Sequence, residues 1–387
     1  MNKNIIRYFL ILVSLLFMTG CWDSRELNDR VIWLASGWDA EEDKKIKISA
    51  QVIIPSTMQP EANNSGPTFF TLTGSGLNVG EALQNLQTKL SREAFFSQRK
   101  AIFLGEDLAK RGIKKELDAT IRGADVSLLA DIFIIKNGTA EDILKLSYPL
   151  ENIPANAASK EYKQLSGKQY TSFLHFLIAA NSDGIRPTIP VIEINGTESK
   201  ESLFQLAGVA IFDENLKLID YLNVDEDRLL LWILGRLKQN TIPMTLNDKN
   251  NISLLLNKLD SKITPTIKND KISFNITLTG EGDITENNSN LDIFITKNLN
   301  YVKKKLEEKV KKDTAQLIAK VQEEYRLDIF GLGETIHKKY PQQWKLLKKD
   351  WDKTFSEAEI SVHAHFEIKQ IGLTGPPLLY EESEIKK

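Results

Sequence analysis

The chain has 387 residues, with 50 Lys and Arg, 52 Asp and Glu, one Cys and a formal net charge of −2. Because there is no basic excess, the composition argues against binding to nucleic acid. A single cysteine excludes an internal disulfide framework, a cysteine-rich zinc module and an iron–sulfur cluster, and no cofactor is expected. The length and the 42% hydrophobic content fit a folded body of two or three domains.

Residues 1–20 have the pattern of a lipoprotein signal peptide. Lys3 and Arg7 form a positively charged start, and the run from Tyr8 to Met18 is uncharged and largely apolar. This run is shorter than the roughly twenty residues of a membrane-spanning helix. We therefore expect a cleaved signal rather than a permanent span.

The only cysteine follows this signal directly. Thr19, Gly20 and Cys21 resemble the end of a bacterial lipobox, with Met18 at a position where Leu is usual. We expect cleavage between Gly20 and Cys21 and a diacylglycerol thioether on Cys21, which would anchor residues 21–30 stably to a membrane. The alternative is a plain secretory signal followed by an incidental buried cysteine, and the Thr-Gly-Cys placement favours the lipoprotein.

Residues 31–200 are predicted to form an N-terminal mixed α/β domain. Strands over 31–38 and 46–54 form a hairpin, and short buried strands follow at 101–104 and 131–135. Two helix starts carry capping pairs three residues apart, Asn78 with Glu81 and Thr139 with Asp142.

Residues 201–250 are predicted to form a small ββαβ middle domain. Strands over 206–212 and 216–222 make a hairpin, an apolar helix runs from Asp225 through Leu237, and a strand follows at 241–246.

Residues 251–375 are predicted to form the C-terminal domain, and 376–387 a tail. A hairpin pairs 254–267 with 272–278, and Pro265 marks an edge or a bulge in its first strand. A long charged helix over Leu291 to Tyr325 follows the hairpin.

A second helix in this domain carries Trp344 and Trp351, seven residues apart and therefore on one face. We expect that face to pack on the sheet, and the alternative is an aromatic stripe that binds a partner. The last strand alternates apolar and polar residues over 360–368. Together these elements predict the α+β class, with largely antiparallel or mixed sheets flanked by helices.

The sequence offers no evident catalytic set. It contains no glycine-rich phosphate loop, no GxSxG elbow and no HExxH motif. His363 and His365 would share one face of the last strand, as a metal site needs, but Glu367 and Lys369 share it too. A solvated strand face is the favoured interpretation, and no metal site or enzyme activity is predicted.

The string from Cys21 to Asp29 resembles the start of the mature Ger(x)C family of spore germination proteins. Further strings similar to the family follow in order through the chain. They are the hairpin near Gly37, Ser91 to Glu93, Leu206 to Phe212, Asp328 to Glu334, Pro341 and Trp344.

This resemblance implies a non-enzymatic lipoprotein of three mixed α/β domains on the outer face of the spore inner membrane. Its partners would be the A and B membrane subunits of a nutrient germinant receptor, and whether it touches the germinant stays open. An alternative function is a lipid-anchored solute-binding protein that delivers a small nutrient to a transporter, and this would need two similar lobes around a cleft. A lipid-anchored hydrolase is disfavoured because no catalytic set is evident.

The segment after the lipidated cysteine differs from a flexible leash, which would be rich in Gly, Ser or Pro. An indole beside the lipid suits the headgroup level. We expect this segment to contact the membrane or the partner subunits, and the alternative is a short passive linker. The residues concerned are Trp22, Asp23, Arg25, Glu26 and Leu27.

Overall fold

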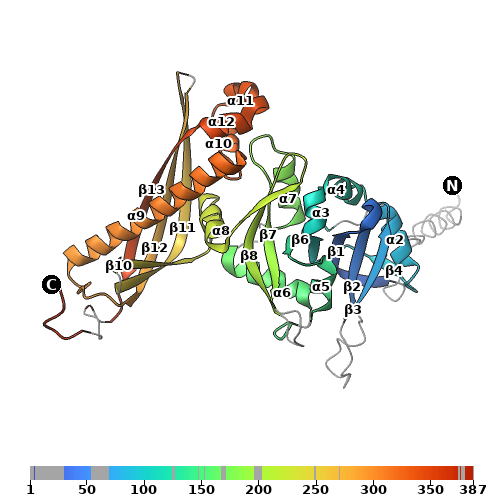
Figure 1. Ribbon diagram of the computed structural model, residues 1–387, viewed down its shortest axis with the longest axis horizontal. Coiled ribbons are helices and arrows are strands. Elements are labelled where there is room, and N and C mark those ends of the chain that lie inside the picture. The colour runs from blue at the N-terminus through green and yellow to red at the C-terminus, as the bar shows by residue number, and fades with distance from the viewer. Residues whose placement is uncertain are drawn as a thin grey trace.

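The computed structural model is elongated, with two β-sheets and helix α8 between them (Figure 1). It describes residue 4 and the ranges 30–53, 69–123, 127–146, 148–151, 153–166, 171–195, 203–247, 250–269, 271–373, 375 and 380–386.

The strands, in chain order, are β1 Arg30–Ala40, β2 Ile46–Ile53, β3 Phe69–Gly76, β4 Glu93–Phe95, β5 Ala101–Gly105, β6 Asp131–Lys136, β7 Thr188–Asn195, β8 Leu203–Phe212, β9 Leu218–Leu222, β10 Asn240–Asn247, β11 Asn250–Lys268, β12 Lys271–Asn287 and β13 Glu359–Gln370.

The α-helices are α2 Val79–Gln87, α3 Glu106–Arg111, α4 Lys114–Ile121, α5 Ala140–Lys145, α6 Pro154–Ser166, α7 Phe173–Ala180, α8 Val224–Ile233, α9 Thr296–Lys320, α10 Leu332–Lys339, α11 Pro341–Leu347 and α12 Trp351–Glu357. Short 3-10 turns lie at η2 Glu42–Lys44 and η5 Lys348–Asp350, and a π-helical turn, η4, at Val321–Tyr325.

Within the described residues, the first sheet has nine strands in the order β3-β2-β1-β5-β6-β7-β8-β9, with β4 added beside the start of β1. Strands β1, β5, β6 and β7 run parallel, while β2, β3, β8 and β9 pair antiparallel. The predicted hairpin of β1 and β2 is confirmed. The sheet is therefore mixed, as expected for the α+β class.

The central strands of this sheet are buried on both faces. In β5 the side chains of Ala101 and Phe103 join the core under α5 and α6, while Ile102 and Leu104 join the core under α2, α3, α4 and α7. A strand covered on both sides is a short continuous apolar run rather than an alternating one. The sequence pattern at 101–104 has this physical origin.

Side-chain caps begin the helices that the sequence marked. The Asn78 side chain accepts a hydrogen bond from the Glu81 amide at 3.0 Å, and Thr139 forms a capping box with Asp142. Both predicted helix starts are thereby confirmed.

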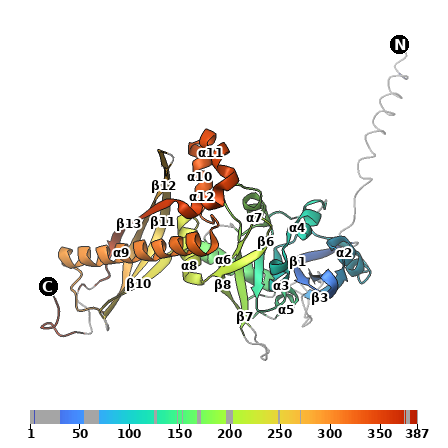
Figure 2. The same ribbon diagram turned by 45° about the horizontal axis from the view of Figure 1, so that its top comes forward.

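The second sheet has four strands among the described residues, in the order β10-β11-β12-β13. Strands β11 and β12 form the predicted hairpin, and β13 lies parallel to β12. A parallel pair needs a long crossover, which α9 to α12 provide. Figure 2 shows α9 lying along this sheet.

Pro265 lies where β11 is locally an edge. Strand β10 pairs with β11 only as far as Leu256, so beyond that residue β12 is the one neighbour of β11 among the described strands. A proline is tolerated there because no second strand needs its missing amide hydrogen.

Two predicted helices end differently in the structure. Helix α8 stops near Leu234 rather than Leu237, because Gly235 takes a left-handed φ of 65° and turns the chain. The long helix begins at Thr296 rather than Leu291, because the Asp292 carboxylate accepts the Phe294 amide in a tight turn before it. The tryptophans lie on two short helices, α11 and α12, rather than on one.

Helix α8 joins the two sheets into one core. It contacts β8 and β11, and the Trp232 ring stacks on Phe366 of β13 at 5.8 Å. The strands of residues 201–250 divide between the sheets: β8 and β9 extend the first sheet, whereas β10 belongs to the second. The domain boundaries at residues 200 and 250 stay a proposal.

Candidate functional site

The predicted anchor lies outside the described residues. This applies to Gly20 and Cys21, and to the segment with Trp22, Asp23, Arg25, Glu26 and Leu27. The first strand begins directly after that segment, at Arg30. The surroundings of Arg30 therefore indicate which part of the folded body follows the predicted anchor.

Arg30 lies at the edge of the first sheet where its parallel strands begin, which we call the amino edge. Strand β1 extends past the start of β5, since Ala35 is level with Ala101, and its first residues pair with β4. The Arg30 guanidinium lies 4.7 Å from the centre of the Phe95 ring. The chain is thus held by a cation–π contact as it enters the sheet.

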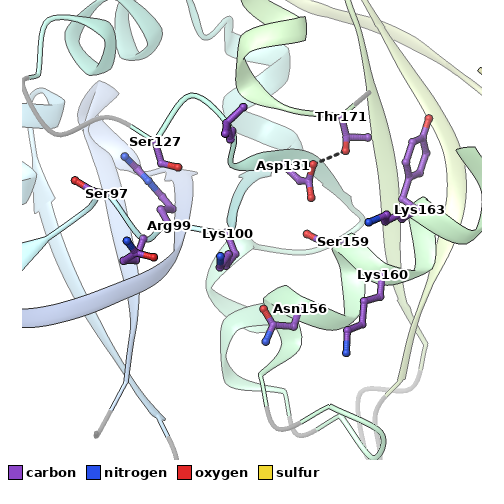
Figure 3. A pocket seen from close by; sticks show the side chains of 13 residues that line it. Ser97, Arg99, Lys100, Ser127, Asp131, Asn156, Ser159, Lys160, Lys163 and Thr171 are labelled. Carbon is purple, nitrogen blue, oxygen red and sulfur yellow. Dashed lines mark hydrogen bonds between the residues drawn. The ribbon is translucent and has the colours of Figure 1, made fainter. Parts of the chain in front are cut away.

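A polar cavity of about 550 Å³ opens near the starts of β5 and β6 (Figure 3). We call it the basic cavity. Its lining comes from the segment before β5, the segment that leads into β6, helix α6 and the residue Thr171 before α7: Ser97, Gln98, Arg99, Lys100, Ser127, Leu129, Asp131, Asn156, Ser159, Lys160, Tyr162, Lys163 and Thr171. Its volume falls within the roughly 300–1,000 Å³ of small-ligand pockets.

Four basic side chains and one carboxylate line this cavity. The carboxylate of Asp131 accepts a hydrogen bond from the Thr171 hydroxyl at 2.6 Å, and Lys160 pairs with Glu151. Lys100 and Lys163 are exposed. The positive excess suits an anionic group, such as a lipid headgroup or an acidic loop of another protein.

Arg99 differs from the lysines because it is only 7% exposed. Its side chain extends away from Lys160 and Lys163 (Figure 3). Burial lowers the pKa of Arg99 to about 10, since the charged form loses hydration. The guanidinium is still charged at neutral pH.

His363 and His365 lie on β13, on the exposed face opposite Val362 and Ala364. Among the residues that the structure describes, no group of three or more His, Cys, Asp or Glu side chains is placed to hold a metal ion. The structure thus places the two histidines as the sequence expected, on a solvated strand face.

Trp344 and Trp351 are buried, 3% and 2% exposed, and their rings meet at 5.2 Å. The Trp351 ring packs edge-on against Phe274 of β12 at 6.4 Å. The expected packing of these residues on the sheet is confirmed. A stripe that binds a partner would need exposed rings.

The Trp351 indole also donates a hydrogen bond to a buried carboxylate, Asp328, at 3.0 Å. Asp328 accepts two more bonds, from the amides of Phe330 and Gly333 at 3.0 and 2.8 Å. Burial raises the pKa of Asp328 to about 6, and these donors oppose the shift. The loop 328–334, one of the strings that carry the resemblance, is therefore organised around this carboxylate.

Two glycines in those strings also have structural reasons. Gly208 of β8 has a φ of 107°, and a Cβ there would lie 2.0 Å from the Leu222 carbonyl oxygen. A Cβ on Gly333 would lie 2.7 Å from the Cα of Gly184, so the loop 328–334 approaches the segment before β7 closely. These strings maintain the fold.

No helix in the described part of the chain has the length and apolar character needed to cross a bilayer.

Sequence reasoning did not identify the basic cavity. Its residues come from three separate segments, 97–100, 127–131 and 156–171, and none has a recognisable spacing. A signal was nevertheless present, since Arg99 and Lys100 directly precede a buried strand, where loops begin at the edge of a parallel sheet.

Two family models together match most of the chain. The spore germination protein N-terminal domain matches residues 23–194, and the C-terminal model, described as spore germination B3/GerAC like, matches residues 207–372. The first match ends in β7 and the second begins within β8, so together they include both sheets.

Curated proteins match along nearly their whole length. The chain is 27% identical to spore germination protein KC of Bacillus subtilis strain 168, over 98% of this chain and 99% of that protein. It is 25% identical to spore germination protein B3 of the same strain, over 96% and 100%.

A solved structure shares the fold. The crystal structure of the GerBC protein superposes with a TM-score of 0.58 at 23% identity, covering 86% of this chain and 96% of that one. The two family models and the full-length relatives all point to one family, and the chain belongs to the Ger(x)C family of spore germination proteins.

Proposed function

We propose that this protein is the membrane-anchored lipoprotein subunit of a nutrient germinant receptor, needed for assembly or signalling of the receptor that triggers spore germination. It acts on the outer face of the spore inner membrane, without catalytic turnover, together with the A and B membrane subunits. The observation that carries this proposal is the full-length similarity to spore germination proteins.

The geometry of the amino edge supports an orientation for the anchored protein. The nine residue steps from Cys21 to Arg30 span at most about 30 Å. With Cys21 in the membrane, Arg30 stays within that reach, and the basic cavity opens on the same edge of the sheet. Exposed Lys100 and Lys163 then face anionic headgroups or the membrane subunits.

The architecture also argues against the solute-binding alternative. In the described residues the two sheets differ in strand number and in pairing. They are not the two similar lobes that close on a nutrient in such a protein.

Mass spectrometry of the protein from dormant spores tests the anchor. We expect a mature chain that begins at a diacylglycerol-modified Cys21. In a Cys21→Ala variant the protein should leave the membrane fraction, and the A and B subunits should no longer co-purify with it. An unprocessed chain that still contains Gly20 and supports germination would contradict the proposal.

Replacement of Trp22, Arg25, Glu26 and Leu27 by Gly or Ser tests the segment behind the lipid. We expect normal lipidation and membrane fractionation, but weaker co-purification of the A and B subunits and slower nutrient germination. Wild-type assembly and germination would show that the segment is a passive linker. That result would leave the anchor itself intact.

A further inference from the structure

A second, smaller cavity of about 190 Å³ lies between the first sheet and the helices α2 and α4. Its floor is formed by Trp38 and Ile48, and Val79 of α2 closes one side. Ala119 and Gly123, at the end of α4, are exposed and lie at its mouth. The cavity is thus mainly apolar and open at the α4 end.

Arg99 contributes the only charge among the described residues that line this cavity. It donates one hydrogen bond, from Nη1 to the Ser36 hydroxyl at 3.1 Å, and its buried Nε has no hydrogen-bond partner. Its guanidinium lies 5.7 Å from the Phe96 ring centre. No carboxylate of the described chain pairs with it, and burial alone shifts its pKa.

A buried guanidinium normally has an anionic partner, because an isolated buried charge is strongly unfavourable. The same protein provides the comparison: Arg186, also largely buried, pairs with the Asp352 carboxylate at 2.6 Å. Arg99 has donors left over and an apolar cavity beside them. The missing partner is therefore expected to enter from outside.

We propose that this cavity binds a small monocarboxylate with a short apolar body, with the carboxylate on Arg99 and Ser36 and the apolar part against Trp38 and Ile48. Ser36 accepts a bond from Arg99, so its own proton is available to the second carboxylate oxygen. This inference goes beyond the proposed receptor function, since it concerns the lipoprotein alone.

Size and charge define the ligand class. A volume of about 190 Å³ holds roughly six water-sized groups, which corresponds to an acid of four or five carbons. One guanidinium balances one negative charge. A phosphate dianion would leave one negative charge unpaired against apolar walls. The free-energy cost of removing that charge from water excludes it, as the same cost makes an unpaired Arg99 unfavourable.

Isothermal titration calorimetry of the full-length mature lipoprotein in detergent tests the proposal, with 3-methylbutanoate as the probe. We expect saturable 1:1 binding. The uncharged 3-methylbutanamide has nearly the same shape and should bind at least about tenfold more weakly, since it lacks the charge-assisted hydrogen bonds.

Three variants complete the test. Arg99→Met should lose binding by about tenfold or more while the unliganded protein melts no lower than wild type. Ala119→Trp, at the exposed mouth, should block entry without touching the charge. Arg186→Met, the matched control, should bind 3-methylbutanoate like wild type.

The proposal is overturned if wild type binds no 3-methylbutanoate up to about 10 mM, a result that would leave a water molecule as the partner of Arg99. Equal binding of the acid and the amide, or unchanged binding by Arg99→Met, would overturn it too. Because the titration uses neither the A nor the B subunit, its outcome is independent of the receptor proposal.

Discussion

Two buried charges in different parts of the fold have contrasting environments. Asp328, in the C-terminal part, is 0% exposed and accepts hydrogen bonds from the backbone of its own loop and from Trp351. Arg99, at the amino edge of the first sheet, is 7% exposed, donates one hydrogen bond, to Ser36, and has an unpartnered Nε. One charge is solvated by the protein and the other is not.

The difference separates a structural charge from a binding charge. A carboxylate surrounded by hydrogen-bond donors fixes the geometry of its loop and needs no external partner. A guanidinium without an anion is unfavourable in the free protein, and such local strain is tolerated where a ligand relieves it. The comparison makes opposite predictions for removing each charge.

Asp328→Ala should give the largest effect. It removes the acceptor of three buried donors at once, so the free energy of unfolding should fall by more than about 3 kcal/mol. Urea unfolding measures this. Asp350→Ala, at the exposed position next to Trp351, should change the free energy of unfolding by less than about 0.5 kcal/mol. A loss below about 1 kcal/mol for Asp328→Ala would remove the structural role.

Asp227 sharpens the comparison, because it is a buried acid without such donors. It is 2% exposed, its Oδ1 has no hydrogen-bond partner, and burial raises its pKa from 3.8 to about 7. The folded state then holds the proton more tightly than the unfolded state. The stability this provides is fully present below about pH 4 and is lost as the pH rises through about 7.

Asp227→Asn imitates the protonated acid. The variant should be more stable than wild type by about 2–4 kcal/mol at about pH 8, and the difference should shrink as the pH falls, reaching near zero only at about pH 4. Asp225→Asn, on the exposed side of the same helix, should show no such pH dependence between these values. A pH-independent difference for Asp227→Asn would contradict the assigned burial cost.

Arg99→Met should raise the stability of the unliganded protein by about 1–2 kcal/mol, because an unpaired buried charge is replaced by an apolar chain. Arg186→Met should lower stability, since it leaves the Asp352 carboxylate without its cation. Paired thermal melts compare the two. If Arg99→Met destabilises the protein as much as Arg186→Met, Arg99 is structural and the contrast with Asp328 fails.

His363 and His365 are exposed, so we expect the smallest effect from their replacement. Replacing both by Ala should change the free energy of unfolding by less than about 0.5 kcal/mol and leave nutrient germination unchanged. Urea unfolding and germination of spores that carry the variant check this. A large loss of germination in a stably folded variant would revive the metal-site hypothesis.

Local elements could be predicted where one signal dominated. The caps at Asn78 and Thr139 and the hairpin of β11 and β12 follow from neighbouring residues alone, because each contact closes within a few positions of chain. The helix ends at Gly235 and Asp292 do not follow from the sequence in this way, because these residues give weaker signals than the apolar periodicity beside them.

The burial of the tryptophans was predictable, but the break between α11 and α12 was not. Trp344 and Trp351 keep a helical spacing of seven residues although the three-residue 3-10 turn η5 separates their helices, so the spacing does not reveal the break. The candidate sites were beyond sequence reasoning for a similar reason. Arg99 contacts Ser36, which lies 63 positions away in the chain. A contact between residues so far apart leaves no periodic pattern in the sequence.

The sequence by itself determined the α+β class, the expected lipid attachment at Cys21 and the resemblance to the Ger(x)C family, because these depend on composition, short periods and contiguous strings. Only the tertiary structure decided how β8, β9 and β10 divide between two sheets and which buried charges find partners. Burial and hydrogen bonding belong to residues brought together from distant segments. No local sequence pattern identifies these residues before the chain folds.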